Sequence, residues 1–325
     1  MSAGVPPARW HALADAGARA AYAALWGVAE TTPFASLAFA DAACAAYGFR
    51  GSLVLAGDAG APDAGLVVYE KRVGPLRAAA LPPYAQFVSP VLRSALDPAS
   101  VHARASPLDA LAAALQVRLH QAALRPDPWL VDARPLAWAG WRLTTAYHTE
   151  AEITGEDGKG RWSRSTRRRA RRHAAEFEIR SGPEQIPAAV ALAAQSHTSK
   201  GLGHPPRDSV ERLARALVEA GMAEAFVAAP ATGGAAEAGL VMAWHGERAH
   251  YWVVGSEPGP AMAVLVGHAT DVLRARGVRR VHFGGANTPS VAEFKRNFGW
   301  HLVPVVRARW VGPRWLRALD ALRPG

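Results

Sequence analysis

The segment near the C-terminal end of this chain constrains its fold more than any other. Residues 279–287 read Arg-Arg-Val-His-Phe-Gly-Gly-Ala-Asn, and residues 291–299 read Val-Ala-Glu-Phe-Lys-Arg-Asn-Phe-Gly. The first part predicts a buried strand that ends in a Gly-Gly turn, because glycine accepts positive φ and leaves room for a ligand where a Cβ would stand. The second part predicts a short helix. Lys295 is therefore expected a few residues beyond the end of a strand, where α/β folds collect ligands.

The composition is that of a globular protein with room for two domains. The chain has 325 residues, half of them hydrophobic, which excludes wholesale disorder. The single cysteine, Cys44, excludes an intrachain disulfide and a cysteine-based zinc site, and we expect it to be a buried core thiol. No apolar run approaches the roughly 18 residues of a membrane span, and the N-terminus does not read as a secretion signal. We expect a cytoplasmic protein.

The charge balance favours anionic partners. The formal net charge is +10 and the sequence pI is about 10.4, and charge this far from zero bears on partners rather than on fold. Candidate partners are tRNA, coenzyme A, nucleotide-linked substrates and an anionic membrane surface. An arginine-rich proteome alone would also raise the pI.

The hydrophobic pattern predicts alternating helices and strands in both halves of the chain. The first half has a Pro-rich irregular segment at 81–90, and a Gly-rich polar connector at 155–160 separates the halves. Predicted helices cover residues 15–29, 36–47, 107–124, 162–175, 187–197, 207–220, 260–276 and 291–298, with a basic amphipathic tail at 313–322. Predicted strands cover residues 51–56, 65–70, 129–131, 141–153, 177–180, 223–229, 237–244, 250–254, 278–283 and 302–310.

The closing motif resembles that of the Fem-type aminoacyltransferases, relatives within the GNAT acyltransferase superfamily. Those proteins typically read Asp-Phe-Gly-Gly, a short gap, and then Phe-Lys-Arg-x-Phe-Gly, and here His282 stands in place of the Asp. The element order of the second half is that of a GNAT domain, and the first half shows a weaker version. The resemblance implies an α/β (α+β) fold of tandem GNAT-like domains, each a mixed, mostly antiparallel sheet flanked by helices. We place the domains at 1–155 and 156–312, followed by the basic tail at 313–325.

Two residues are candidates for catalysis. Acyl transfer to an amine passes through a tetrahedral oxyanion, which a fixed cation stabilises, and the resemblance gives this role to Lys295. The alternative is a surface lysine on an amphipathic helix. His282 is a candidate base, because an imidazole with a pKa near neutrality could take a proton from the attacking ammonium; a structural histidine is the alternative.

The predicted donor site is made of basic residues and one turn. The turn at 255–262 follows a strand and opens a helix, as the pyrophosphate-binding turn of GNAT enzymes does. The usual Gly-rich consensus is absent, however, and Glu257 would repel a pyrophosphate. The arginine run at 161–172 forms a stripe at helical spacing that suits phosphates, although a solvated charged face is also possible. The predicted donor or phosphate-binding residues are Arg164, Arg167, Arg168, Arg171, Gly259 and Arg296.

The predicted acceptor site includes the polar loop at 195–206, whose Gly and Pro content suits a substrate-binding lid. Tyr251 and Trp252 fall on opposite faces of one strand, so that one of them could line a pocket. The histidines are too scattered to predict a metal site. The predicted acceptor-binding residues are His197, His204, Tyr251, Trp252 and Asn287.

These patterns predict an amide-forming N-acyltransferase with no tightly bound cofactor. The donor is expected to be aminoacyl-tRNA and the acceptor a small-molecule amine. One alternative is an acyl-CoA-dependent GNAT enzyme that acts on a small-molecule, sugar or natural-product amine. The others are a non-catalytic GNAT-like protein that binds RNA or an anionic membrane surface, and a coenzyme-binding regulatory module.

Overall fold

The computed structural model describes residues 7–93, 101–130, 132–155, 158–313 and 315–317. The chain divides into two compact units. The first takes the residues up to Ala146 together with those from Val305 onwards, and the second runs from Tyr147 to Pro304. The sequence predicts a division at residue 155, whereas residues 147–155 belong to the second compact unit and residues 305–312 to the first.

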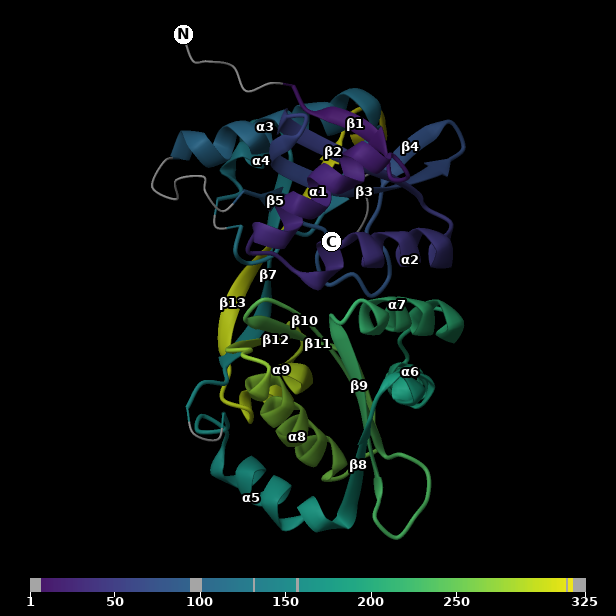
Figure 1. The fold of residues 1–325 in the computed structure, drawn as a ribbon, viewed down its shortest axis with the longest axis vertical. Coiled ribbons are helices and arrows are strands. Elements are labelled where there is room, and N and C mark those ends of the chain that lie inside the picture. Colours follow the sequence, from purple (N-terminus) through teal and green to yellow (C-terminus); the bar gives the residue numbers. More distant parts are fainter. Residues whose placement is uncertain (1–6, 94–100, 131, 156–157, 314, 318–325) are drawn as a thin grey trace. The chain divides into compact units, whose positions relative to one another are not determined.

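The first unit is a mixed sheet with helices (Figure 1). Its strand order is β1-β2-β3-β4-β6-β13, and β5 pairs with Ala64 and Gly65 near the start of β3. The pairs are antiparallel except for β4 and β6, which run parallel. The strands are β1 (Arg9–Ala12), β2 (Arg50–Asp58), β3 (Ala61–Val73), β4 (Leu76–Ala79), β5 (Val91–Leu92), β6 (Gln121–Leu124) and the last part of β13 (His301–Val311). The helices are α1 (Ala16–Val28), the 3-10 turn η1 (Pro33–Ala35), α2 (Leu37–Tyr47), α3 (Val101–Arg118) and α4 (Arg134–Trp138).

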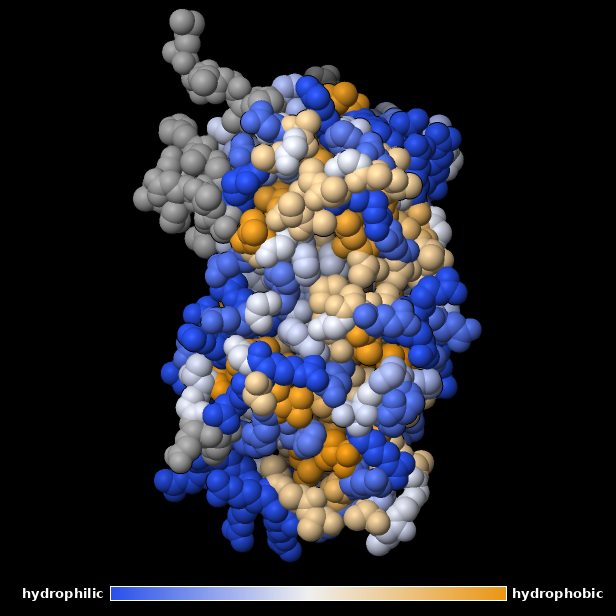
Figure 2. All heavy atoms as spheres, viewed as in Figure 1, coloured by the Kyte–Doolittle hydropathy of each residue, from blue (hydrophilic) through white to orange (hydrophobic). Residues whose placement is uncertain are grey.

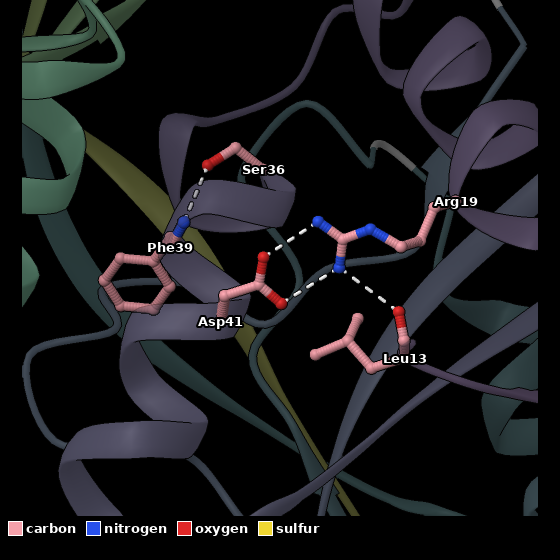
Figure 3. A network of polar contacts seen from close by, with 5 residues as sticks. All are labelled: Leu13, Arg19, Ser36, Phe39 and Asp41. Atoms are coloured by element: carbon pink, nitrogen blue, oxygen red, sulfur yellow. Dashed lines mark hydrogen bonds and ion pairs between the residues drawn. The ribbon is translucent and has the colours of Figure 1, made fainter. Parts of the chain in front are cut away.

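Caps and one ion pair fix the opening helices of this unit. The Asp15 carboxylate accepts from the N–H of Ala18 at the start of α1, and Ser36 caps α2 in the same way, which satisfies N–H groups that a helix end leaves open. Figure 3 shows the Arg19 guanidinium in two hydrogen bonds to the Asp41 carboxylate, at 2.8 and 2.9 Å, and a third to a backbone carbonyl. The side chains tie α1 to α2 on an exposed face.

The second unit repeats this plan with strand order β7-β12-β11-β10-β9-β8. The β11–β12 pair is parallel and the others are antiparallel. The strands are β7 (Arg142–Glu152, from its residue 147), β8 (Phe177–Ser181), β9 (Ala223–Pro230), β10 (Ala238–His245), β11 (Arg248–Ser256) and β12 (Arg280–Gly285). The helices are α5 (Arg164–Arg172), the 3-10 turns η2 (Ala174–Glu176) and η3 (Pro183–Gln185), α6 (Ile186–Thr198), α7 (Arg207–Glu219), α8 (Ala261–Ala275) and α9 (Pro289–Arg296).

Helices cover both faces of the second sheet (Figure 1). On one face α8 packs on Val281, Phe283 and Tyr251 in a continuous apolar core. On the other face α6 lies directly on the strands, because Gly239 and Gly255 are cross-strand neighbours there. A Cβ on Gly255 would stand 2.1 Å from the backbone of the helix, so only glycine allows this approach.

The predicted α/β class with mostly antiparallel sheets is confirmed, while several boundaries were wrong. The helix predicted at 107–124 ends at Arg118, and residues 121–124 form β6 instead. No strand forms at Trp129–Leu130, and residue 131 lies outside the described residues. Of the predicted tail helix, residues 315–317 are helical; residues 314 and 318–325 lie outside the described part.

Candidate active site

The two parallel strands of the second unit stop pairing before either strand ends. β11 and β12 pair only over residues 248–250 and 280–282, although both strands continue beyond His250 and His282. At the same level β11 carries a bulge, since Tyr251 and Val253 face consecutive residues of β10 and Trp252 is the extra residue. A bulge re-aims the backbone and is common beside active sites. The residues around this point, where the strand pairing ends, form the candidate site.

Lys295 reaches the end of β12 from α9. Its ammonium donates to the carbonyl of Gly285 at 2.7 Å and to the carbonyl of Phe283, on either side of Gly284, whose φ is +74°. The side chain is 7% exposed, and burial lowers the pKa of Lys295 to about 7. A lysine ammonium has three N–H donors, so the two carbonyls leave one for a ligand.

The turn after β12 is held by Asn287. Its side-chain oxygen accepts from the N–H of Tyr147 at 2.8 Å, and its side-chain nitrogen donates to the carbonyl of the same residue at 3.0 Å. The amide therefore pairs with backbone as a neighbouring strand would. Asn287 therefore holds the turn whose carbonyls accept from Lys295. The role of Asn287 in acceptor binding stays a prediction.

His282 belongs to a buried cluster of three histidines. Its Nε2 lies 3.1 Å from Nδ1 of His148, and its Nδ1 accepts from the N–H of Gly284 at 3.3 Å. The rings of His282 and His250 are 5.4 Å apart. Because Nδ1 of His282 is an acceptor, its Nε2 carries the proton and donates to His148.

The expected near-neutral pKa of His282 was wrong. The side chain is 1% exposed, and burial, then His250, His148 and Lys295, lower the pKa of His282 well below its usual range. Burial likewise lowers the pKa of His250 to about 3, with Arg248 adding to it. The imidazole of His282 is neutral with both nitrogens engaged, which favours a positioning role over that of a base.

A carboxylate lies beside this cluster. Glu150 on β7 is the cross-strand neighbour of His282 and is 5% exposed. Burial raises the pKa of Glu150, while Arg248 and Arg280 oppose this shift. A polar row therefore crosses three strands on the face opposite the α8 core.

The predicted acceptor residues lie in different places. Tyr251 is packed in the core, with its hydroxyl 3.3 Å from the sulfur of Met262, and burial raises its pKa. Trp252 is the bulge residue and is 6% exposed. His197 and His204 come together at the end of α6, with ring centroids 5.3 Å apart. Acceptor contact by any of these residues stays a prediction.

The predicted phosphate-binding arginines gather on α5, away from the buried lysine. Four of them, with Arg172, line a hollow of about 540 Å³, and Figure 2 shows hydrophilic side chains gathered over this helix. Arg296 instead pairs with Glu293 on α9 at 2.7 Å, and Gly259 lies in the exposed turn before α8 with a φ of +156°. The lining residues of the hollow are Arg164, Arg167, Arg168, Arg171 and Arg172.

The structure thus joins Lys295, His282 and Asn287 at one strand end and leaves the arginines, Gly259 and the His197–His204 pair outside it. His148 was missed, because its contact with His282 spans 134 residues. Among the described residues, no group of three or more His, Cys, Asp or Glu is placed to hold a metal ion. No described helix is long and apolar enough to cross a membrane.

Comparison with known proteins agrees with this geometry. Residues 159–296 match the acetyltransferase (GNAT) domain family. The second unit is a GNAT domain. The region that matches contains β11, β12 and Lys295, and the matched family is one of acetyltransferases, so the chain is an acyltransferase. No curated protein sequence matches the chain.

Solved structures extend the fold assignment to nearly the whole chain. FemX is 12% identical with a TM-score of 0.73, covering 92% of this chain and 97% of FemX. A tandem GNAT protein from the clavulanic acid biosynthesis pathway is 12% identical with a TM-score of 0.55, covering 94% and 99%. L-PGS from Bacillus licheniformis is 12% identical with a TM-score of 0.51, covering 80% and 85%. At these identities the likeness is one of fold, and it confirms the predicted tandem GNAT-like architecture.

Proposed function

We propose that this protein is an amide-forming N-acyltransferase that moves an aminoacyl group from charged tRNA to the amine of a small molecule. The observation that carries the proposal is the buried ammonium of Lys295, held by two backbone carbonyls where the parallel strands no longer pair. A cation in a water-poor site stabilises a developing oxyanion far better than one in water.

The reaction needs no covalent enzyme intermediate, because an aminoacyl ester is already activated. The neutral amine of the acceptor attacks the ester carbonyl, and the third N–H of Lys295 donates to the oxyanion that forms. The carbon–oxygen bond to the ribose then breaks, and the proton lost by the amine is taken up by the departing ribose oxygen. His282 and His148 hold the strand end in place during these steps.

The arginines of α5 support an RNA-linked donor. Arg164, Arg167 and Arg168 lie within two turns of one helix that carries no acidic residue. Like charges at this spacing destabilise a helix unless something neutralises them, and bidentate phosphate contacts do so. We propose that phosphates of the donor lie over this helix, and that Arg296 and Gly259 flank the donor nearer the reacting ester.

An acyl-CoA donor is the second candidate, and the start of α8 favours it. The N-cap residue Pro260 makes no side-chain cap bond, and an uncapped helix N-terminus is a place where a pyrophosphate can bind. Glu257 is the obstacle, but its carboxylate accepts from Gln195 at 2.5 Å. The acceptor would then be an amine on a small molecule, a sugar or a natural product.

The acceptor amine is proposed to enter near the end of α6 and the loop after it, where His197 and His204 lie, with Trp252 and Asn287 shaping the inner wall and Tyr251 packed behind it. A cytoplasmic location goes with either donor, because charged tRNA and coenzyme A are both found there. The positive charge of α5 would also allow contact with an anionic membrane surface.

The donor can be tested directly with the purified protein. Native mass spectrometry would compare a pool of charged tRNAs with coenzyme A and acetyl-CoA at moderate salt, followed by a transfer assay against a library of amines. We expect retention of charged tRNA and transfer of its amino acid. Stoichiometric coenzyme A without charged-tRNA selectivity would make the acyl-CoA reaction the function, and binding without transfer to any amine would indicate a non-catalytic binding or regulatory protein.

A further inference from the structure

A second hollow lies between α5 and α8, apart from the end of β12 that Lys295 contacts. Its volume is about 350 Å³, within the range of small-molecule pockets. Its lining has an aliphatic part, the floor, made of Ala170 and Ala174, Ile179 of β8 and Val264 of α8, and Trp162 and His268 also line it. Figure 2 shows apolar surface beside the hydrophilic patch over α5.

A glycine in the middle of α8 keeps this floor open. Gly267 lines the hollow, and a Cβ there would make only ordinary contacts, 3.6 Å from Lys159 and 3.7 Å from Cη2 of Trp162. Glycine inside a helix costs about 1 kcal/mol relative to alanine. Packing therefore does not require glycine at this position. The lack of a side chain there leaves the floor of the hollow open.

The rim of the hollow is cationic. Arg167 and Arg171 stand one helical turn apart and line both this hollow and the larger one formed by arginines alone. At the other end Lys159 pairs with Asp271 at 2.6 Å, so that this lysine is already neutralised. The paired guanidinium groups above an aliphatic floor suit an anionic head on an apolar body.

We propose that this hollow binds a small anionic amphiphile, with an aliphatic chain against Gly267 and a phosphate across Arg167 and Arg171. An aliphatic chain fits better than a nucleotide base, because bases bind on exposed aromatic faces. Of the two rings in the lining, Trp162 is 5% exposed and packs against Phe298 with ring centroids 4.9 Å apart, and His268 offers only the small ring of an imidazole. The inference does not depend on the acyl-transfer proposal.

Trp162, which lines the hollow, packs against Phe298 just after the helix that carries Lys295. The segment that begins α5 is fastened to the end of α9 by the bond from the N–H of Ser163 to the carbonyl of Asn297, at 2.9 Å. Gly299 lies so close to Arg161 that a Cβ would stand 2.1 Å from its carbonyl oxygen. A ligand in the hollow therefore contacts residues that also support α9, and it competes with any polyanion for Arg167 and Arg171.

Isothermal titration with n-alkyl phosphates, below their micelle concentrations, tests the proposal on the full-length protein. Inorganic phosphate, butyl, hexyl and octyl phosphate form the series, and AMP represents a base in place of a chain. We expect affinity to rise about fourfold for each methylene buried until the hollow is full. Affinity that does not change with chain length, or AMP binding as tightly as octyl phosphate, would overturn the proposal.

Two matched pairs of variants locate the site. Arg167→Ala with Arg171→Ala should weaken octyl phosphate about tenfold or more, whereas Arg169→Ala with Arg172→Ala removes the same charge outside the hollow and should change it less than threefold. Gly267→Leu should abolish the chain-length dependence and Gly267→Ala should keep it, with thermal melting to confirm folding. Equal losses from both arginine pairs would indicate diffuse electrostatics and contradict a defined site.

Discussion

The two units share an architecture but differ in the residues that form their parallel strand pair. In the first unit the parallel pair joins Ala78 to Gln121 and Ala79 to Ala122. In the second unit the corresponding pair ends in His250 and His282, both fully or nearly buried. The same strand order therefore frames a neutral, mostly small-residue surface in one unit and a polar, titratable one in the other.

The helix that follows the parallel pair also differs between the units, in the burial of its cationic side chain. In the first unit α4 begins at Arg134, which is exposed and pairs with Asp132 at 2.8 Å. In the second unit α9 carries a buried ammonium that donates to the strand end. An exposed, paired cation contributes little to a site, whereas a buried one near neutrality in pKa can act on a substrate. The comparison places the chemistry in the second unit, while the first repeats the framework.

The largest expected effect tests that contrast. Lys295→Ala should lower kcat for acyl transfer by about 10²–10³-fold, as loss of an oxyanion donor does elsewhere. The matched change in the first unit, Arg134→Ala, should leave kcat within about twofold. Steady-state kinetics with the donor identified by mass spectrometry would measure both. Equal losses from the two changes would break the comparison.

Packing of helices on the sheets gives the next effect. Gly255→Ala should destabilise the protein by about 3 kcal/mol or more, because the new Cβ meets helix backbone that cannot move aside. Gly65→Ala in the first unit meets the ring of Tyr22 at 2.8 Å instead, and the expected cost is about 1–2 kcal/mol. Chemical denaturation would rank them, and the reverse order would show that α6 does not rest on the strands as described.

Stability should also rise with pH because of Lys295. Its pKa is lowered from 10.5 to about 7 in the folded chain. Between these values the unfolded chain holds a proton that the folded chain has released, so the free energy of unfolding increases with pH by at most about 1.4 kcal/mol per unit. Below pH 7 both states are protonated and the contribution is flat. Denaturation of wild type and Lys295→Met from pH 6 to 10 isolates this term, and identical slopes would show that the lysine is not buried.

The smallest effect comes from the exposed ion pair of Figure 3. Asp41→Ala should cost less than about 1 kcal/mol, because Arg19 and Asp41 are 32% and 49% exposed and water screens them. Asp271→Ala, which breaks the exposed pair with Lys159 in the second unit, should cost as little. A loss above 2 kcal/mol in thermal melting would show that surface pairing also distinguishes the units.

Local patterns predicted much of the fold, and non-local pairing explains the errors. The helix at 261–275 and the strands at 238–245 and 248–256 follow from periodicity that extends over a few positions. Residues 121–124 were predicted as helix, because their strand identity comes from partners in β4 and β13, far along the chain. The compact units differ from the predicted division for the same reason, since β13 pairs with β6 of the first unit.

The candidate site was predicted in part. Lys295 and the Gly-Gly turn stand close in sequence, so the motif shows them together. The depth of burial that lowers the pKa of Lys295 comes from packing around it and has no local signal. His148 lies 134 residues from His282 and belongs to a different predicted element, and nothing in its own neighbourhood marks it.

The pH dependence of single-turnover acyl transfer tests the central claim most directly. The rate of wild type would be divided by that of Lys295→Arg at each pH from 5.5 to 9, which cancels the titration of the attacking amine, since arginine keeps its charge throughout. If the charged lysine stabilises the oxyanion, this ratio falls as pH rises through about 7. A ratio that is constant, or that rises through the same region, would contradict the account.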